Sequence, residues 1–292
     1  MFRWLAVFFA VLMVTEKGHA QSDSADFRQR RLLFFTASGT LYAGSMLALG
    51  HTWYSKYEHD SFHWFNDNRE WLQMDKAGHA FTAYILNSAL YEGFLYSGYS
   101  PKKSALSSFI SACAVMAGIE FFDGFSAKWG ASYGDLLFNL GGVSLSTVQR
   151  MWMKEKWLQP KFSFHSTRYA AYYPDALGHR FTESILKDYN GQTYWLAMPV
   201  KRIHNDLPEW LCLSLGYGAE GMVGGRDNSV LPDEIYFPRY RQYFLSMDIN
   251  LQGIKTRSTF LRTCFKTFNI IRIPFPALEF SRGKLKGHLL YF

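Results

Sequence analysis

Six polar side chains lie at the ends of apolar segments in the first half of the chain. They are Asp75, His79, Glu120, Asp123, Asp135 and Asn139. They form three pairs, and within a pair the residues are three or four positions apart, so both side chains share one face of a helix. Acidic groups are costly to bury unless they pair, bind a proton or bind a cation. The spacing therefore predicts that the three pairs converge on one polar centre.

Two kinds of chemistry suit this set of residues. Carboxylates that lie close together push their pKa values apart, and with a histidine they can act as general acid and base. The same oxygens and the imidazole can also hold a divalent cation. A purely structural role is the alternative. Asp75 and Asp135 stand at the starts of helices, where an acidic residue is favoured, and His79 and Asn139 could be core residues whose hydrogen-bonding groups are paired. The chain contains no GxSxG, HExxH, P-loop or dinucleotide motif, so those mechanisms have no support.

Four apolar segments must position these residues. They run over residues 32–50, 76–96, 104–122 and 133–153, and they are rich in alanine, serine and glycine. The first is nearly long enough to cross a bilayer, whereas the charge-free stretches of the last two are short for a crossing. We expect a compact four-helix bundle that is embedded in a membrane or rests on one.

The chain changes character after Pro160. The pair Asn190-Gly191 is typical of a tight turn. In two later segments, 211–218 and 243–251, large apolar residues alternate with mostly small or polar ones, with a period of two. These features predict short β-strands. The expected fold class is therefore α+β, with a helical bundle domain over residues 21–158 and a basic, aromatic α/β segment over 159–292 packed on the bundle.

The first twenty residues are typical of a signal peptide. One early cation, an apolar run of eleven residues and small residues before Gln21 favour cleavage after residue 20, although an uncleaved anchor is the alternative. We therefore expect an exported protein that faces the periplasm and associates with the inner or the outer membrane. Three cysteines without a CxxC motif exclude a disulfide framework and a zinc finger. The residue directly after the predicted cleavage point is Gln21 and not a cysteine, so lipid cannot be attached there.

Charge is divided unevenly between the two halves. Residues 1–148 hold 11 Lys and Arg against 12 Asp and Glu, a net charge of −1, whereas residues 149–292 hold 20 against 12, a net charge of +8. An exported protein rarely meets nucleic acid, so a membrane lipid or a lipid-linked, phosphorylated glycan is the expected partner. Arg168, Arg180 and Lys187 are candidates to hold its anionic head. The alternative is that these charges only keep the surface solvated.

The order of the polar residues resembles a known family. The pattern is Asp75-Lys76-x-x-His79, then Glu120, then Asp123-Gly124, and finally Asp135-x-x-x-Asn139-x-x-Gly142. It resembles the uncharacterised YfiM-type family of predicted periplasmic lipoproteins, in an extended form, and is more distantly similar to the VanZ-like membrane proteins. The resemblance covers about residues 70–145. It implies a helical bundle in the envelope of a Gram-negative bacterium, with the polar centre facing a membrane surface, but it supplies no reaction. The chain departs from the family in lacking a lipidation cysteine and from the VanZ pattern in its strand-containing second half.

Two functions follow from these observations. The first is a membrane-associated enzyme that acts on a lipid-linked or phosphorylated envelope substrate through the six polar residues, with a divalent cation as a possible cofactor. The second is a non-catalytic assembly factor or scaffold in which the polar centre is structural. A small outer-membrane barrel, suggested by the terminal Phe292, needs about eight strands, of which the sequence shows two convincing ones.

Overall fold

A computed structural model describes residues 24–52, 58–153, 156–232 and 234–292, so the predicted signal peptide lies outside the described residues. The chain divides into two compact units, which do not follow a single cut of the sequence. The helical unit contains Met1–Asp67 and Thr82–Glu155, and the sheet unit contains Asn68–Phe81 and Lys156–Phe292. The boundary falls within one continuous helix.

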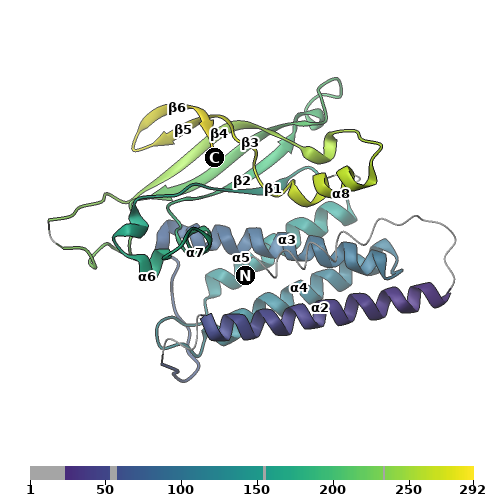
Figure 1. The fold of residues 1–292 in the computed structure, drawn as a ribbon, viewed down its shortest axis with the longest axis horizontal. Helices are drawn as coiled ribbons and strands as arrows, with labels where there is room; N and C mark the ends of the chain where they lie inside the picture. Colours follow the sequence, from purple (N-terminus) through teal and green to yellow (C-terminus); the bar gives the residue numbers. More distant parts are fainter. Residues whose placement is uncertain (1–23, 53–57, 154–155, 233) are drawn as a thin grey trace. The chain divides into compact units, whose positions relative to one another are not determined.

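Each of the four predicted helices overlaps an observed one (Figure 1). They are α2 (Ser24–Thr52), α3 (Met74–Tyr96), α4 (Pro101–Asp123) and α5 (Tyr133–Met151). Helix α2 begins eight residues before the predicted segment, because its first turns are polar and carry no apolar signal. The Ser100 side chain caps α4 by accepting a hydrogen bond from the Lys103 amide at 3.4 Å, and Pro101 occupies the first turn, where it needs no partner for its nitrogen.

Small side chains let the helices of this unit approach closely. The core is formed by Phe34, Ala83, Leu90, Phe94, Ala112, Met116 and Val143, which come from all four helices. Ala83 and Ala112 are completely buried. The Phe34 ring lies so close to Gly93 that an added Cβ would come within 2.1 Å of it, so only glycine fits there. The finer arrangement, a membrane-associated four-helix bundle, stays a prediction.

Helices α3 and α5 run in the same direction with a constant register. Three side-chain hydrogen bonds set this register: Asn87 with Thr147 at 2.9 Å, Ser88 with Ser146 at 2.9 Å, and Arg150 with Glu92 at 3.3 Å. The paired positions differ by 58 to 60 residues along the chain.

Within the described residues, one helix is long and apolar enough to cross a membrane by length and composition, namely α4. A core helix of a soluble protein meets the same criterion. The large hydrophobic side chains of α4 that are exposed are Leu106, Ile110, Phe121 and Phe122.

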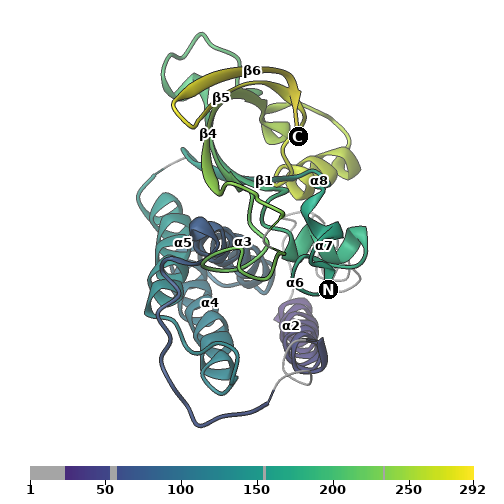
Figure 2. The same cartoon turned by 90° about the vertical axis from the view of Figure 1, so that its left-hand side faces the viewer.

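The sheet unit contains six antiparallel strands in chain order. They are β1 (Gln159–Phe164), β2 (Gln192–Pro199), β3 (Leu211–Glu220), β4 (Tyr240–Ile249), β5 (Phe275–Ser281) and β6 (Lys284–Tyr291). Figure 2 shows that the sheet is strongly curved. Short helices fill the connections: α6 (Pro174–Leu177) and α7 (Phe181–Lys187) before β2, and α8 (Thr259–Phe268) before β5. The predicted strands correspond to β3 and β4, and the predicted turn at Asn190-Gly191 directly precedes β2, whereas β1, β5 and β6 were not foreseen. The sheet that the described residues form has six strands, fewer than the roughly eight that the outer-membrane barrel hypothesis requires.

One face of this sheet exposes a row of large apolar side chains. A cross-strand row formed by Leu196, Leu215, Leu245 and Leu278 lies on one face, and all four side chains are exposed. The alternate positions of the strands carry buried polar residues such as Ser214, Ser246 and Asp248. Period-two alternation therefore places large apolar side chains outward, whereas the inward positions combine buried polar residues with a hydrophobic cluster that contains Trp195 and Phe244.

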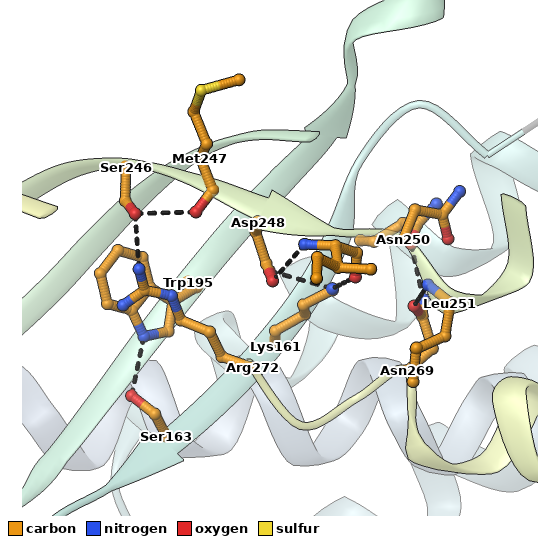
Figure 3. A network of polar contacts seen from close by, with 12 residues as sticks. Lys161, Ser163, Trp195, Ser246, Met247, Asp248, Asn250, Leu251, Asn269 and Arg272 are labelled. Atoms are coloured by element: carbon orange, nitrogen blue, oxygen red, sulfur yellow. Dashed lines mark hydrogen bonds and ion pairs between the residues drawn. The ribbon is translucent and has the colours of Figure 1, made fainter. Parts of the chain in front are cut away.

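Buried charges are paired on the inner face (Figure 3). Lys161 and Asp248 are both completely buried and form an ion pair of 2.9 Å. The guanidinium of Arg272 lies 3.5 Å above the Trp195 ring and donates to the Ser246 hydroxyl at 2.5 Å. Burial lowers the pKa of Arg272 to about 10, which leaves it charged. This network explains how the polar face tolerates burial.

Candidate functional site

Ser132 lies at the centre of the polar cluster in the helical unit. Its backbone amide donates to Oε2 of Glu120 at 3.2 Å, and its hydroxyl donates to Oδ1 of Asp67 at 2.6 Å. The same hydroxyl oxygen accepts a hydrogen bond from the Asp135 amide at 3.2 Å, which makes Ser132 the N-cap of α5. One residue therefore links the end of α4, the start of α5 and the segment that precedes α3.

Glu120 is the most perturbed acid in this cluster. It occupies the last turn of α4 and is only 3% exposed. Burial, and then the negative charge of Asp135, raise the pKa of Glu120 to about 8, although the Ser132 amide opposes the rise. Asp123 and Asp67 raise this pKa further. The Glu120 carboxyl therefore holds a proton at neutral pH.

Two further carboxylates lie close to each other beside Glu120. A carboxylate oxygen of Asp135 lies within 4.8 Å of one of Glu120, and one lies within 4.8 Å of one of Asp67. Asp135 is nearly fully buried in the first turn of α5, where the helix dipole favours an anion. Such spacing suits a shared proton or a cation held by oxygen ligands.

Asp67 was missed by the sequence analysis, which treated its surroundings as a connector. The backbone explains its position: the Phe65 amide donates to the Ala131 carbonyl at 2.9 Å, and the Ala131 amide donates to the His63 carbonyl at 3.1 Å. These bonds lay residues 63–65 alongside the loop before α5. No local pattern in the sequence indicates this pairing, because it joins segments more than sixty residues apart.

Asp123 and Asn139 have different surroundings. Asp123 accepts a hydrogen bond of 2.7 Å from the Trp129 indole, so it closes the loop between α4 and α5. Its charge raises the pKa of Glu120. Asn139 is buried one turn after Asp135 on α5. The structure of the helical unit thus brings Glu120, Asp135 and Asp67 together, with Asp123 nearby.

Asp75 and His79 belong to the first two turns of α3, in the part of the helix assigned to the sheet unit. Asp75 forms an ion pair of 3.0 Å with the buried Lys76. Within this unit, Gly78 allows the close approach of Tyr194, whose hydroxyl would lie 2.8 Å from an added Cβ. Burial raises the pKa of Tyr194, and the charge of Asp75 adds to the rise. That Asp75 and His79 join the cluster of the helical unit stays a prediction.

The turn before α3 is strained. Trp71, Leu72 and Gln73 have φ values of 46°, 49° and 65°, which place three successive non-glycine residues in the left-handed region. Each such residue costs about 1–2 kcal/mol. The Trp71 amide donates to the Gly225 carbonyl at 2.7 Å, and the Tyr217 hydroxyl donates to the Leu72 carbonyl. These contacts with β3 and with the loop that follows it hold the strained turn and fix where α3 begins, directly before Asp75.

The three basic residues proposed to hold an anionic head lie in different settings. Arg168 stacks over the rings of Tyr169 at 5.6 Å and Phe237 at 5.2 Å. Arg180 precedes the first turn of α7, and Lys187 lies in its last turn. Nothing in these positions joins them into one anion site, so their role stays a prediction.

The cluster falls within a region that matches a known family. Residues 61–151 match the family described as Predicted periplasmic lipoprotein (DUF2279). This stretch contains all six predicted site residues as well as Asp67. The match supports the resemblance to uncharacterised periplasmic lipoproteins and confirms the predicted localisation: the protein is exported, faces the periplasm and associates with a membrane. No curated protein and no solved structure matches the chain.

Proposed function

We propose that this protein is a membrane-associated envelope enzyme that acts on a lipid-linked or phosphorylated substrate. The observation that supports the proposal is the convergence of three carboxyl groups around Ser132, namely those of Glu120, Asp135 and Asp67. Glu120 is buried among them, and burial and the neighbouring acids raise its pKa to about 8. A purely structural carboxyl would gain more from a basic partner than from acidic neighbours. A buried, perturbed acid among further titratable groups is characteristic of functional sites.

Asp75 and His79 extend this centre in the proposal. They stand four residues apart in the first turns of α3 and therefore share one face of that helix. His79 also lies four residues before the core residue Ala83, on the same face of the continuous helix. The pattern shared with YfiM-type and VanZ-like proteins contains these residues in the same order.

The proposed reaction uses a divalent cation to bind the substrate and side chains to transfer protons. Asp135 and Asp67 offer paired carboxylate oxygens to a divalent cation, which would bind the phosphate oxygens of the substrate. In this proposal the buried Glu120 donates a proton to the leaving oxygen as the phosphorus–oxygen bond breaks. In the same proposal His79 accepts a proton from the attacking water, and Asn139 has an orienting role.

The scaffold alternative has an observation in its favour. The hydrogen bonds of Ser132 with Glu120 and Asp67, and of Trp129 with Asp123, join helix ends in the way that a structural network would. On this alternative, every substitution in the cluster lowers stability and function together. The proposed enzyme requires that some substitutions separate the two.

The test measures the rate of phosphate release and the melting temperature of the same proteins. The purified protein is mixed with vesicles that contain a polyprenyl diphosphate and Mn²⁺, and phosphate release is followed for wild type, Glu120→Gln and His79→Ala. The proposal expects both variants to lose about a hundredfold or more in rate while their melting temperatures do not fall. The matched control is Glu58→Gln, which changes an exposed glutamate of the same unit. Equal turnover in all four proteins, or none in wild type, would exclude the proposed reaction on this substrate.

A further inference from the structure

Helix α8 presents its apolar face to solvent and its polar face to the protein. Thr263 and Thr267 are 7% and 8% exposed, whereas Phe260 and Phe268 are 69% and 50% exposed. In a surface helix of a soluble protein the apolar stripe normally faces the core. The orientation of α8 is therefore opposite to the one that burial of apolar surface alone would select.

The exposed face is a continuous apolar stripe. With 3.6 residues per turn, one side of the helix carries Phe260, Leu261, Cys264, Phe265 and Phe268. Leu261 is exposed like the two phenylalanines, and so are Ile254 before the helix and Ile271 after it. Single exposed apolar residues are ordinary, but a stripe of this kind marks an interaction surface.

The stripe lies within a long basic segment. Residues 249–278 contain no acidic residue and carry five cations: Lys255, Arg257, Arg262, Lys266 and Arg272. Of these, Lys255, Arg257 and Arg262 are exposed. Exposed aromatic side chains flanked by arginine and lysine are complementary to a surface that is both apolar and anionic.

The helix is held firmly against the sheet on its other side. Asn269, directly after α8, donates to Oε1 of Gln159 at 2.7 Å and accepts from the Leu251 amide at 2.8 Å (Figure 3 shows the second contact). The Phe162 amide of β1 donates to the Ile270 carbonyl at 2.9 Å. Because these contacts are made by polar groups next to the helix, the apolar stripe stays outward without being needed for the fold.

We propose that α8 is an interfacial helix that lies in the plane of an anionic lipid bilayer, with Phe260, Leu261 and Phe268 in the acyl region and Arg257 and Arg262 at the headgroup phosphates. Ten residues of helix extend about 15 Å, half the thickness of the hydrocarbon core, so α8 lies in the interface and does not cross. The absence of any acid from residues 249–278 favours a lipid surface over a protein surface of mixed charge. The inference is independent of the polar centre, and it gives the sheet unit its own contact with the membrane.

A local probe tests this assignment. Residues 4–14 form an apolar run that can also bind vesicles, so total binding of the full chain is not a clean readout. An environment-sensitive fluorophore is therefore attached in Leu261→Cys after replacing Cys113, Cys212 and Cys264 with alanine, and folding is verified by circular dichroism. The control places the probe in Tyr236→Cys, a loop position whose side chain is 81% exposed. Vesicles of phosphatidylglycerol should shift the emission to the blue at position 261 and leave position 236 unchanged.

Substitutions then separate the contribution of the apolar side chains to lipid binding from that of the cations. Phe260→Ser with Phe268→Ser, or Arg257→Gln with Arg262→Gln, should each raise the lipid concentration for half-maximal shift about tenfold or more. Lys284→Gln with Lys286→Gln, two exposed cations of β6, should leave it unchanged. High salt should weaken the wild-type shift. No shift at position 261, an equal shift with neutral phosphatidylcholine, or protection of the probe by a periplasmic protein in the absence of vesicles would overturn the proposal.

Discussion

The backbone amide of Ser132 donates a hydrogen bond of 3.2 Å to Oε2 of Glu120 and so ties the start of α5 to the end of α4. This bond stabilises the ionised form of Glu120, yet burial and neighbouring acids still raise the pKa to about 8. The net effect is a carboxyl that holds a proton at neutral pH but lies close to releasing it.

Ser132→Ala should lower the free energy of unfolding by about 2 kcal/mol, because it removes both the helix cap and the hydrogen bond to Asp67. Ser100→Ala is the matched control, since Ser100 caps α4 and should cost only about 1 kcal/mol. Urea unfolding of both variants measures the difference. Equal losses would mean that the contact between Ser132 and Asp67 adds nothing to stability.

Glu120→Gln should change how stability depends on pH. The pKa of Glu120 is raised from about 4.5 to about 8 in the folded state, so the folded protein binds the proton more tightly than the unfolded chain. Its contribution to stability is therefore complete below about pH 4.5 and is lost as the pH rises toward 8. The variant should lack this decline and should unfold at a higher temperature than wild type at pH 9. Thermal unfolding from pH 5 to 9, with Glu58→Gln as the control, would contradict the assignment if wild type and Glu120→Gln gave parallel curves.

Asp135→Asn should remove the cation binding proposed above, because Asp135 lies close to both Glu120 and Asp67 and would supply the central oxygen ligands. We expect Mn²⁺ to raise the melting temperature of wild type at pH 7 and to have no effect on this variant. Asp60→Asn changes an exposed aspartate of the same unit and should keep the wild-type response. An unchanged Mn²⁺ response in Asp135→Asn would place the cation elsewhere.

Lys161→Met should destabilise the sheet unit by about 3–5 kcal/mol, because it leaves Asp248 charged and buried without its partner. Adding Asp248→Leu to this variant should recover most of the loss, since no isolated charge remains. Guanidinium unfolding of the single and double variants tests the point. A double variant that is less stable than the single one would show that the pair contributes net stability.

Much of the helical unit could be predicted from composition alone. Long uncharged segments gave four helices whose observed ends differ from the expected ones by a few residues, except for the polar start of α2. The clustering of Glu120 with Asp135 follows from the short loop between α4 and α5. Asp67 could not be found in this way, because its place depends on backbone pairing of residues 63–65 with a distant loop.

The sheet unit was harder to predict for a physical reason. Strand β1 has only six residues, and β6 is exposed at nearly every position, so neither shows a clear alternation of buried and exposed residues. The amphipathic pattern of α8 is visible in the sequence, but its inverted orientation is set by polar contacts of Asn269 with residues far along the chain. Local sequence indicates that a helix has two faces and does not indicate which face is buried.

The rate of phosphate release by Glu120→Gln, measured at the same pH as its melting temperature, tests the central claim most directly. A catalytic centre predicts a loss of about a hundredfold or more in rate from a protein at least as stable as wild type at pH 8. A variant that releases phosphate as fast as wild type, or that loses activity only in proportion to its folded fraction, would contradict it.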